Sequence, residues 1–290
     1  MDIIKYIILG IIQGITEPLP ISSSGHIRIF KSIFNTNMFN DLNFEIISNF
    51  GSFLAILFIF RKDISKLIKG FFNYLFIKNK IINDTMNEET KISIKEQNFK
   101  KKEAKPSFKY CLLLLFASIP VGITGILFKD ILEEKLASIK IVGIALLITA
   151  LALFVVKNIK GSKEDKDITL WDAILIGLLQ GIAIIPGISR SGTVLVGCLL
   201  RDFKRETALK FTFMLYFPVS IVAMGLGIFD ILKDPNLSTI IIPYILGMLA
   251  AGIITYFAYK WLSKLVKEGK LIGFAIYCVI IGLFVLYYFR

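Results

Sequence analysis

Residues 10–26 read GIIQGITEPLPISSSGH, and residues 177–193 read GLLQGIAIIPGISRSGT. The two stretches align without gaps at a constant offset of 167 residues, and eight of their seventeen positions are identical. The identical positions include glycine, glutamine and serine, which chance similarity between apolar segments rarely places in register. We therefore interpret the two stretches as copies of one motif, with one copy in each half of the chain.

Each copy predicts a helix that is broken inside the membrane. An apolar segment too short to cross a bilayer, 3–16 or 170–185, meets a stretch rich in Pro, Gly and Ser that cannot continue as regular helix. A second short segment follows, at 23–33 or 191–200. Irregular backbone at membrane depth is tolerated when it is buried in protein or lines a polar cavity, and interrupted segments in two halves point to a midplane site. The two predicted re-entrant motifs occupy residues 3–33 and 170–200.

Composition places the chain in a membrane. Of its 290 residues, 55% are hydrophobic, and the mean hydropathy is +0.71, whereas soluble domains are about 45–50% apolar. Runs long enough to span about 30 Å of hydrocarbon lie at 43–60, 109–128, 139–157, 207–229, 238–259 and 271–289. We expect an all-α integral membrane protein with six transmembrane helices plus two re-entrant broken-helix pairs in an inverted repeat.

Basic residues lie between the apolar runs and predict the orientation. Residues 61–109 carry thirteen Lys and Arg against six Asp and Glu, and cytoplasmic loops are enriched in Lys and Arg. We therefore expect the loop 61–108 to be cytoplasmic. Counting spans from there, the first half (1–157) and the second half (158–290) of one membrane domain have opposite topology, and both termini are extracytoplasmic.

The central polar region has no periodic apolar pattern over residues 79–108, which predicts a mobile cytoplasmic loop. Just before it, residues 64–72 place apolar side chains at helical spacing among lysines. Two interpretations stay open for them: a helical extension of the preceding span, or an interfacial helix on the cytoplasmic leaflet.

Several classes of function are disfavoured. The formal net charge is +12, but no basic stripe is interleaved with exposed aromatic residues, so we predict no nucleic-acid partner. Three isolated cysteines give neither a disulfide framework nor a zinc site, and His26 is the only histidine. A hard cation held by a carboxylate and substrate phosphates remains open.

Glu17 and Arg190 are the only charged residues deep within the broken segments. A buried charge in a membrane costs at least about 2.5–3.5 kcal/mol on insertion scales and usually marks a functional site. One interpretation is an ion pair that holds the repeats together. We favour a polar site for a charged ligand, because a purely structural pair would not need the surrounding hydroxyls and glycines.

The residues around both breaks suit phosphate. Each break leads into a short helix, whose N-terminal amides and partial positive charge bind anions, and glycine allows close backbone approach. Serines in such positions are also common helix caps. His26 follows Ser23 by three residues and, on a helix, would share its face as a general acid or base. The candidate phosphate-binding residues are Ser22, Ser24, Gly25, Ser189, Ser191, Gly192 and Thr193.

These residues resemble the undecaprenyl-diphosphate phosphatase family, also called the bacitracin-resistance protein family. The family's first motif, Glu or Gln followed four residues later by Glu, matches Gln13 and Glu17, and it continues as PISSSGH at 20–26. The second motif matches PGISRSGT at 186–193. The resemblance covers the whole chain, in its length, span pattern and both motifs.

The resemblance implies hydrolysis of undecaprenyl diphosphate to undecaprenyl phosphate at the extracytoplasmic face. This reaction recycles the lipid carrier of cell-wall synthesis and confers bacitracin resistance. Carried across by residue, Glu17 and Gln13 would assist a divalent cation, Mg²⁺ or Ca²⁺. Ser23 would be the candidate nucleophile, His26 its acid/base partner and Arg190 the clamp on the transition state.

Two positions depart from the family pattern. Many members have Glu where this chain has Gln13, so a site that needs two carboxylates is in doubt, and Pro18 stands where an aromatic residue is frequent. The alternative function is an inverted-repeat transporter or flippase for polyprenyl phosphate lipids, since transporters favour this architecture. The sequence leaves open whether Ser23 forms a phosphoenzyme, and it leaves open the oligomeric state, a homodimer included.

Overall fold

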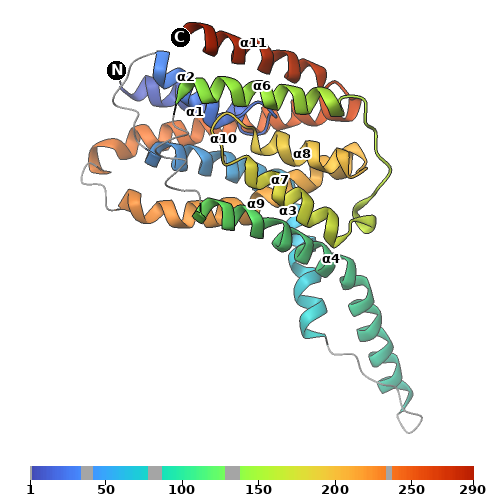
Figure 1. Ribbon diagram of the computed structural model, residues 1–290. Coiled ribbons are helices and arrows are strands. Elements are labelled where there is room, and N and C mark those ends of the chain that lie inside the picture. The colour runs from blue at the N-terminus through green and yellow to red at the C-terminus, as the bar shows by residue number, and fades with distance from the viewer. Residues whose placement is uncertain (1, 34–41, 78–86, 128–137, 233–236) are drawn as a thin grey trace.

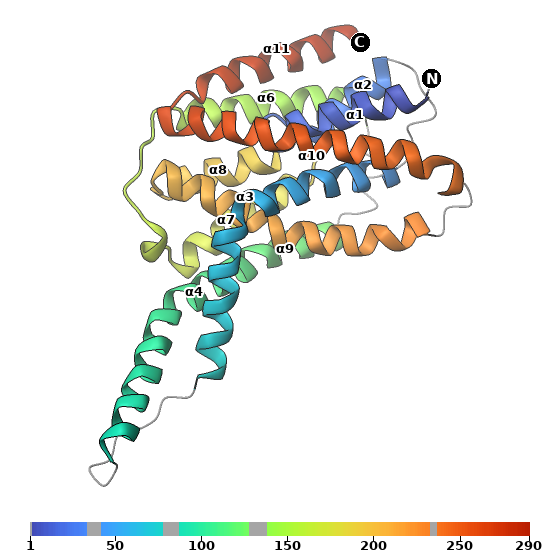
Figure 2. The ribbon, with the colours of Figure 1, turned by 180° about the vertical axis from the view of Figure 1, so that it is seen from behind.

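The computed structural model describes residues 2–33, 42–77, 87–127, 138–232 and 237–290. These residues are mainly α-helical and contain no β-strand, only an isolated bridge between Lys163 and Phe203. Most helices run along one another in a bundle, and a helical hairpin leaves the bundle at one end (Figures 1 and 2). The prediction of an all-α membrane protein is confirmed.

Both broken-helix pairs form as the motif predicts. In the first copy, α1 (Asp2–Thr16) is followed by turns and then by α2 (Ser23–Ile33). In the second copy, α7 (Leu170–Ile182) and α8 (Arg190–Leu200) flank the matching break. Neither α1 nor α7 is long enough to cross about 30 Å of hydrocarbon, so each break lies inside the bundle.

Five helices of the described ranges are long and apolar enough to cross a membrane. They are α3 (Leu42–Phe76), α4 (Glu88–Leu127), α6 (Ile139–Val156), α9 (Arg205–Leu232) and α10 (Leu237–Glu268). The last expected span forms α11 (Ile272–Tyr288), which has 17 residues. A short 3₁₀ turn, η2 (Asp165–Asp167), precedes α7. The chain is a multi-pass membrane protein, and the layout of six spans stays a prediction.

The two copies pack in matching ways. A β-carbon on Gly10 of α1 would lie 2.1 Å from the carbonyl oxygen of Gly247 in α10, and one on Gly177 of α7 would lie 2.3 Å from that of Ala117 in α4. These aligned glycines therefore let each short helix rest directly on the backbone of a long one. The start of α1 and the end of α11 lie at one end of the bundle, whereas the 157–169 connection and the α3–α4 hairpin lie toward the other (Figure 1).

The second pair is anchored at that other end by Asp172, which is fully buried in the first turn of α7. Burial would raise the pKa of this carboxyl, but hydrogen bonds from Thr169, Arg201 and Lys163 lower the pKa to about 2. The Arg201 Nε atom lies 2.6 Å and the Lys163 Nζ atom 3.0 Å from the carboxylate. A charged carboxylate at a helix N-terminus is further favoured by the helix dipole.

One sequence prediction is wrong. Residues 88–108 do not form a loop, because they are the first part of α4, and residues 79–86 lie outside the described residues. This helix packs on residues 61–76, which continue α3 without interruption. Residues 64–72 are therefore a helical extension of the preceding span, and their location in the membrane interface stays a prediction. Ring stacking of Phe108 on Phe71 and Tyr74, with centroids 5.3 and 4.4 Å apart, supplies contacts that the local sequence pattern does not show.

Candidate active site

The two breaks face each other inside the bundle. A β-carbon on Gly25 would lie 3.1 Å from the Gly187 Cα atom, and one on Gly192 would lie 3.1 Å from the Pro20 side chain. The Ser191 hydroxyl donates across the interface to the Leu19 carbonyl oxygen at 3.1 Å. The two copies of the repeat therefore bring their own irregular segments into direct contact, as expected of a midplane site.

The serines cap the second helix of each broken pair, α2 and α8, in the same way. The Ser22 hydroxyl accepts a hydrogen bond from the Gly25 amide at 3.2 Å, and the Ser189 hydroxyl accepts one from the Gly192 amide at 3.1 Å. The neighbouring hydroxyls of Ser24 and Ser191 lie 3.4 and 3.3 Å from these caps. The predicted phosphate-binding serines are thus also helix caps, and they orient the N-terminal turns toward the space between the breaks.

Thr193 and the Ser22 backbone complete this frame. The Thr193 hydroxyl donates to the Ser189 carbonyl oxygen at 2.7 Å, within its own helix. Ser22 has a φ of +70°, a left-handed conformation that costs a serine free energy. The surrounding packing holds this strain at the point where the first break turns into α2.

Glu17 is the centre of the site. Its Oε2 atom accepts hydrogen bonds from the Ser23 hydroxyl at 2.5 Å and from the Gln13 amide at 2.9 Å. Its Oε1 atom lies 3.4 Å from Nη2 of Arg190, in the other copy. The Glu17 side chain is 6% exposed and that of Arg190 is 30% exposed. Predicted residues from both halves thus converge on one buried carboxylate.

His26 has other partners. Its Nδ1 atom lies 2.7 Å from the Ser22 carbonyl oxygen, and its Nε2 atom lies 2.8 Å from the hydroxyl of Tyr277 in α11. The His26 ring also stacks on the Tyr277 ring, with centroids 5.5 Å apart. The structure therefore places Glu17, and not His26, next to the Ser23 hydroxyl. A catalytic role for His26 stays a prediction.

Two residues of the site were not predicted from the sequence, Gln180 and Tyr216. Both line a small cavity of about 20 Å³ together with Glu17 and Arg190. The Arg190 guanidinium lies 5.5 Å from the centre of the Tyr216 ring, and the Tyr216 hydroxyl donates to Asn49 at 2.6 Å. A cation over an aromatic face is attracted by the ring quadrupole, so Tyr216 helps to hold the guanidinium in place.

Gln180 is buried, and its Oε1 atom has no hydrogen-bond partner among the described residues. Buried acceptors are nearly always paired, so an unpaired one beside Glu17 and Arg190 indicates a ligand-binding role. The repeat contained a signal for this residue, because Gln180 aligns with Gln13. No comparable signal marks Tyr216 within the apolar run 207–229.

The first break also borders an apolar groove of about 360 Å³. Tyr277, the partner of His26, is one of its lining residues. The others are Ile15, Thr16, Leu19, Ile21, Trp261, Leu265, Lys270, Gly273 and Phe274. The histidine–tyrosine pair therefore stands between the polar break and an apolar surface large enough for part of a hydrocarbon chain.

Few groups could hold a metal ion. Within the described ranges, no three His, Cys, Asp or Glu residues form a cluster suited to one. Glu17 is the sole carboxylate at the breaks, and the Gln13 amide beside it adds no charge. Mg²⁺ commonly binds through one or two carboxylates plus substrate phosphates. This donor set therefore fits a divalent cation that binds together with a diphosphate, and the cation stays a prediction.

The model of the bacitracin resistance protein BacA family matches residues 6–284. The chain belongs to the bacitracin resistance protein BacA family. Its similarity to curated relatives extends over nearly its full length. It is 41% identical to undecaprenyl-diphosphatase 2 of Bacillus thuringiensis (strain Al Hakam), over 98% of this chain and 97% of the relative. It is 42% identical to undecaprenyl-diphosphatase of Oceanobacillus iheyensis, over 98% and 96%.

The family match contains both breaks of this BacA-family chain and every residue of the site described above. The resemblance predicted from the two motifs is therefore confirmed. The relatives are named for a diphosphatase activity, which agrees with a site that combines an arginine, a carboxylate and a hydroxyl.

Proposed function

We propose that this BacA-family chain hydrolyses undecaprenyl diphosphate to undecaprenyl phosphate and inorganic phosphate. The observation that carries the proposal is the convergence of Glu17, Ser23 and Arg190 between the two breaks. The names of the relatives supply the substrate. Through this activity the protein recycles the cell-wall lipid carrier and confers bacitracin resistance.

Arg190 binds the diphosphate and stabilises the negative charge of the transition state. Its planar fork matches phosphate oxygens, and its present partner, the Glu17 Oε1 atom, is 3.4 Å away. The diphosphate competes with Glu17 for this guanidinium, while the ring of Tyr216 keeps it aimed into the site. The amides at the starts of α2 and α8 take the remaining oxygens, at helix ends suited to anions.

Ser23 is the nucleophile and Glu17 its base in this scheme. The Ser23 oxygen attacks the terminal phosphorus, and its proton passes to the Glu17 Oε2 atom, which already accepts its hydrogen bond at 2.5 Å. The bond between that phosphorus and the bridging oxygen breaks, and the lipid phosphate leaves. Water then attacks the phosphorus of the phosphoserine, and the bond between phosphorus and the Ser23 oxygen breaks. The Ser23 oxygen takes its proton back from Glu17, and the phosphate leaves with the protons of the water.

This step has a direct test. Rapid quenching with ³²P-labelled substrate and mass spectrometry should find a phosphate on Ser23 in the wild type. Attack by water, oriented by Glu17 and His26, would leave Ser23 unmodified, and that result would replace the covalent scheme.

Glu17 would hold a divalent cation, Mg²⁺ or Ca²⁺, together with the bound diphosphate, and Gln13 would be its uncharged neighbour. Such an ion supplies charge neutralisation for the leaving phosphate. The groove beside the first break takes part of the isoprenoid chain. The chain lies in the bacterial cell membrane with the basic end of the bundle toward the cytoplasm. Both termini and the opening of the site are then on the extracytoplasmic side.

The test is phosphate release from undecaprenyl diphosphate by the purified protein in detergent. We expect activity that EDTA abolishes and that Mg²⁺ or Ca²⁺ restores. Lack of phosphate release by the wild type, combined with movement of undecaprenyl phosphate between vesicle leaflets, would favour the transporter alternative. Hydrolysis that persists in EDTA would contradict the role of the cation and would still support the phosphatase activity.

A further inference from the structure

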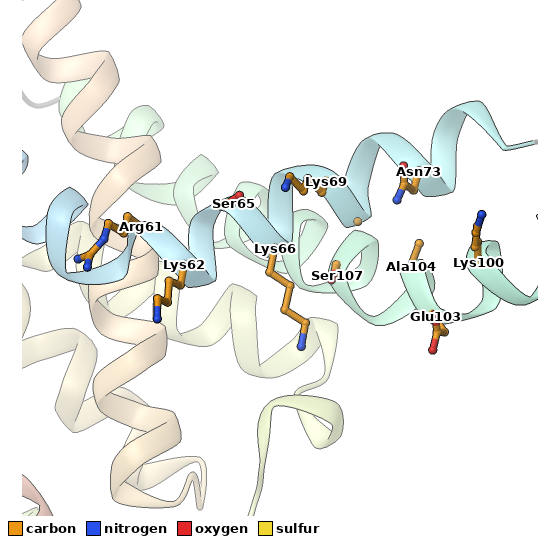
Figure 3. Close-up of a pocket in the computed structure, with 11 residues that line it drawn as sticks. Arg61, Lys62, Ser65, Lys66, Lys69, Asn73, Lys100, Glu103, Ala104 and Ser107 are labelled. Carbon is orange, nitrogen blue, oxygen red and sulfur yellow. The ribbon is translucent and has the colours of Figure 1, made fainter.

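The α3–α4 hairpin contains a second polar concavity, far from the breaks along both helices. Between residues 61–73 of α3 and 100–107 of α4 lies a groove of about 780 Å³ (Figure 3). Five basic residues line it: Arg61, Lys62, Lys66, Lys69 and Lys100. The other lining residues are Ser65, Gly70, Asn73, Glu103, Ala104 and Ser107.

Tight helix packing forms the floor of this groove. A β-carbon on Gly70 would lie 2.4 Å from the Ser107 side chain, so glycine permits the two helices to touch here. Gly70 and Ala104 are buried, and beyond them Phe108 stacks on Phe71 and Tyr74. The lysines therefore stand on a fixed helical frame.

The groove carries uncompensated positive charge. In the described part of the chain, Lys62, Lys66, Lys69 and Lys100 form no ion pair, and Glu103 is the only acidic lining residue. Arg61 lies at the base, where it donates to the Phe58 carbonyl oxygen at 2.6 Å and covers the Phe58 ring. Lysines that line one groove without acidic partners attract an anion.

A row of exposed apolar side chains runs beside the lysines on α3. Ile68, Phe72, Leu75 and Phe76 are 51%, 50%, 49% and 75% exposed, at spacings of four, three and one residue. This spacing puts them along one side of the helix. The hairpin turns aside from the direction of the bundle helices, and both views show this (Figures 1 and 2). A basic surface next to an apolar one is typical of elements that lie in a membrane interface.

We propose that the hairpin is a binding site for an anionic phospholipid of the adjoining leaflet. The headgroup phosphate lies in the groove among Lys66, Lys69 and Lys100, while the row that begins at Ile68 contacts the acyl chains. Arg61 directly follows the predicted span 43–60, so the groove begins at the level of the headgroups. The charge and the apolar row together favour a lipid over a soluble anion. The site is separate from the hydrolytic one and does not depend on its chemistry.

The experiment uses the full chain in detergent, titrated with phosphatidylglycerol or phosphatidylcholine and followed by native mass spectrometry. The test variant replaces Lys66, Lys69 and Lys100 by Gln. A matched control replaces Lys95, Lys102 and Lys105 by Gln, which removes the same charge from the same hairpin outside the groove. Each basic residue near an anionic surface contributes about fivefold in affinity, so the groove variant should bind phosphatidylglycerol about 100-fold more weakly and the control within about fivefold of the wild type.

Additional variants and measurements test the lipid site further. Both variants should retain wild-type phosphatase activity in detergent, which shows that they fold. The replacement of Phe72 and Phe76 by Ser should also weaken phosphatidylglycerol binding. Equal losses in the groove and control variants, or equal binding of phosphatidylcholine, would overturn the site. Full displacement of phosphatidylglycerol by millimolar inorganic phosphate would make the groove a free-phosphate site and overturn its assignment to a lipid.

Discussion

The two breaks share a backbone design and differ in the groups that they present. In both, a serine hydroxyl caps the following helix at its third residue, Gly25 or Gly192, within 0.1 Å of the same distance. The differences fall at aligned positions: Glu17 matches Ile184, and Ser23 matches Arg190. The repeat thus supplies two similar anion-binding frames, and divergence places the carboxylate and hydroxyl in one and the guanidinium in the other.

The surroundings of the breaks also differ. Seven of the eleven residues of α8 are buried, against three of the eleven in α2. Gly187, at a φ of +98°, is held in the second break by the Thr149 hydroxyl, which donates to its carbonyl oxygen at 3.4 Å. The first break instead borders the apolar groove. The comparison suggests a fixed clamp in the second copy and, in the first, a break that borders an apolar groove.

Removal of the guanidinium should produce the largest effect. Arg190→Ala should lower kcat/KM for undecaprenyl diphosphate by about 1,000-fold, because it deletes the guanidinium proposed to bind the reacting phosphate. Arg190→Lys should recover part of the loss, since it restores charge without the planar fork. The matched control is Arg290→Ala, at the chain end, which should be unchanged. A wild-type rate in Arg190→Ala would contradict the hypothesis that the second copy supplies the guanidinium for the reaction.

Neutralising the Glu17 carboxylate should have the second-largest effect on the rate of hydrolysis. Glu17→Gln keeps the side-chain shape but cannot take the Ser23 proton, so kcat should fall by about 100-fold. Stimulation by Mg²⁺ should also disappear if Glu17 holds the cation. Glu45→Gln, which breaks the Lys31–Glu45 pair at 2.7 Å, controls for the loss of an acidic partner elsewhere in the same half. Unchanged cation dependence in Glu17→Gln would assign the ion to other ligands.

His26 and Tyr277 should behave as one unit. Because their contact lies between the first break and the apolar groove, His26→Ala and Tyr277→Phe should each raise KM by about tenfold with a smaller change in kcat. The double variant should be no worse than the more impaired single one. The steady-state parameters of the three variants decide the matter. A large fall in kcat for His26→Ala alone would instead place the imidazole in the chemical step.

Replacement of Gln180 should have the smallest effect on the rate of hydrolysis. It should also make the protein more stable. Gln180→Met removes a buried acceptor that has no protein partner, which should raise the free energy of unfolding by about 1 kcal/mol. The same change should lower kcat several-fold, because Gln180 lines the cavity that contains Glu17 and Arg190. Thermal melts in detergent and initial rates measure the two quantities. A variant that is less stable and fully active would mean that Gln180 has a purely structural role.

The local signals in the sequence were strong where the chain breaks. The Pro, Gly and Ser clusters predicted the ends of α1 and α7 and the starts of α2 and α8 to within about three residues. They did so because proline and capping serines act on their own neighbours. The prediction failed at 88–108, where the helix is stabilised by contacts with α3 through Ser107 and Phe108. A pattern read along one segment contains no information about a partner helix.

The same distinction holds at the site. The sequence by itself determined the membrane class, the repeat of the broken motif and the identities of Glu17, Ser23 and Arg190, because charges and helix breaks in apolar segments are rare and costly. The tertiary structure alone decided which of these groups touch. It paired Ser23 with Glu17, directed His26 to Tyr277, and brought Gln180 and Tyr216 to the cavity. Such pairings depend on how helices distant in the chain pack and rotate against one another, and no spacing along the sequence specifies that rotation.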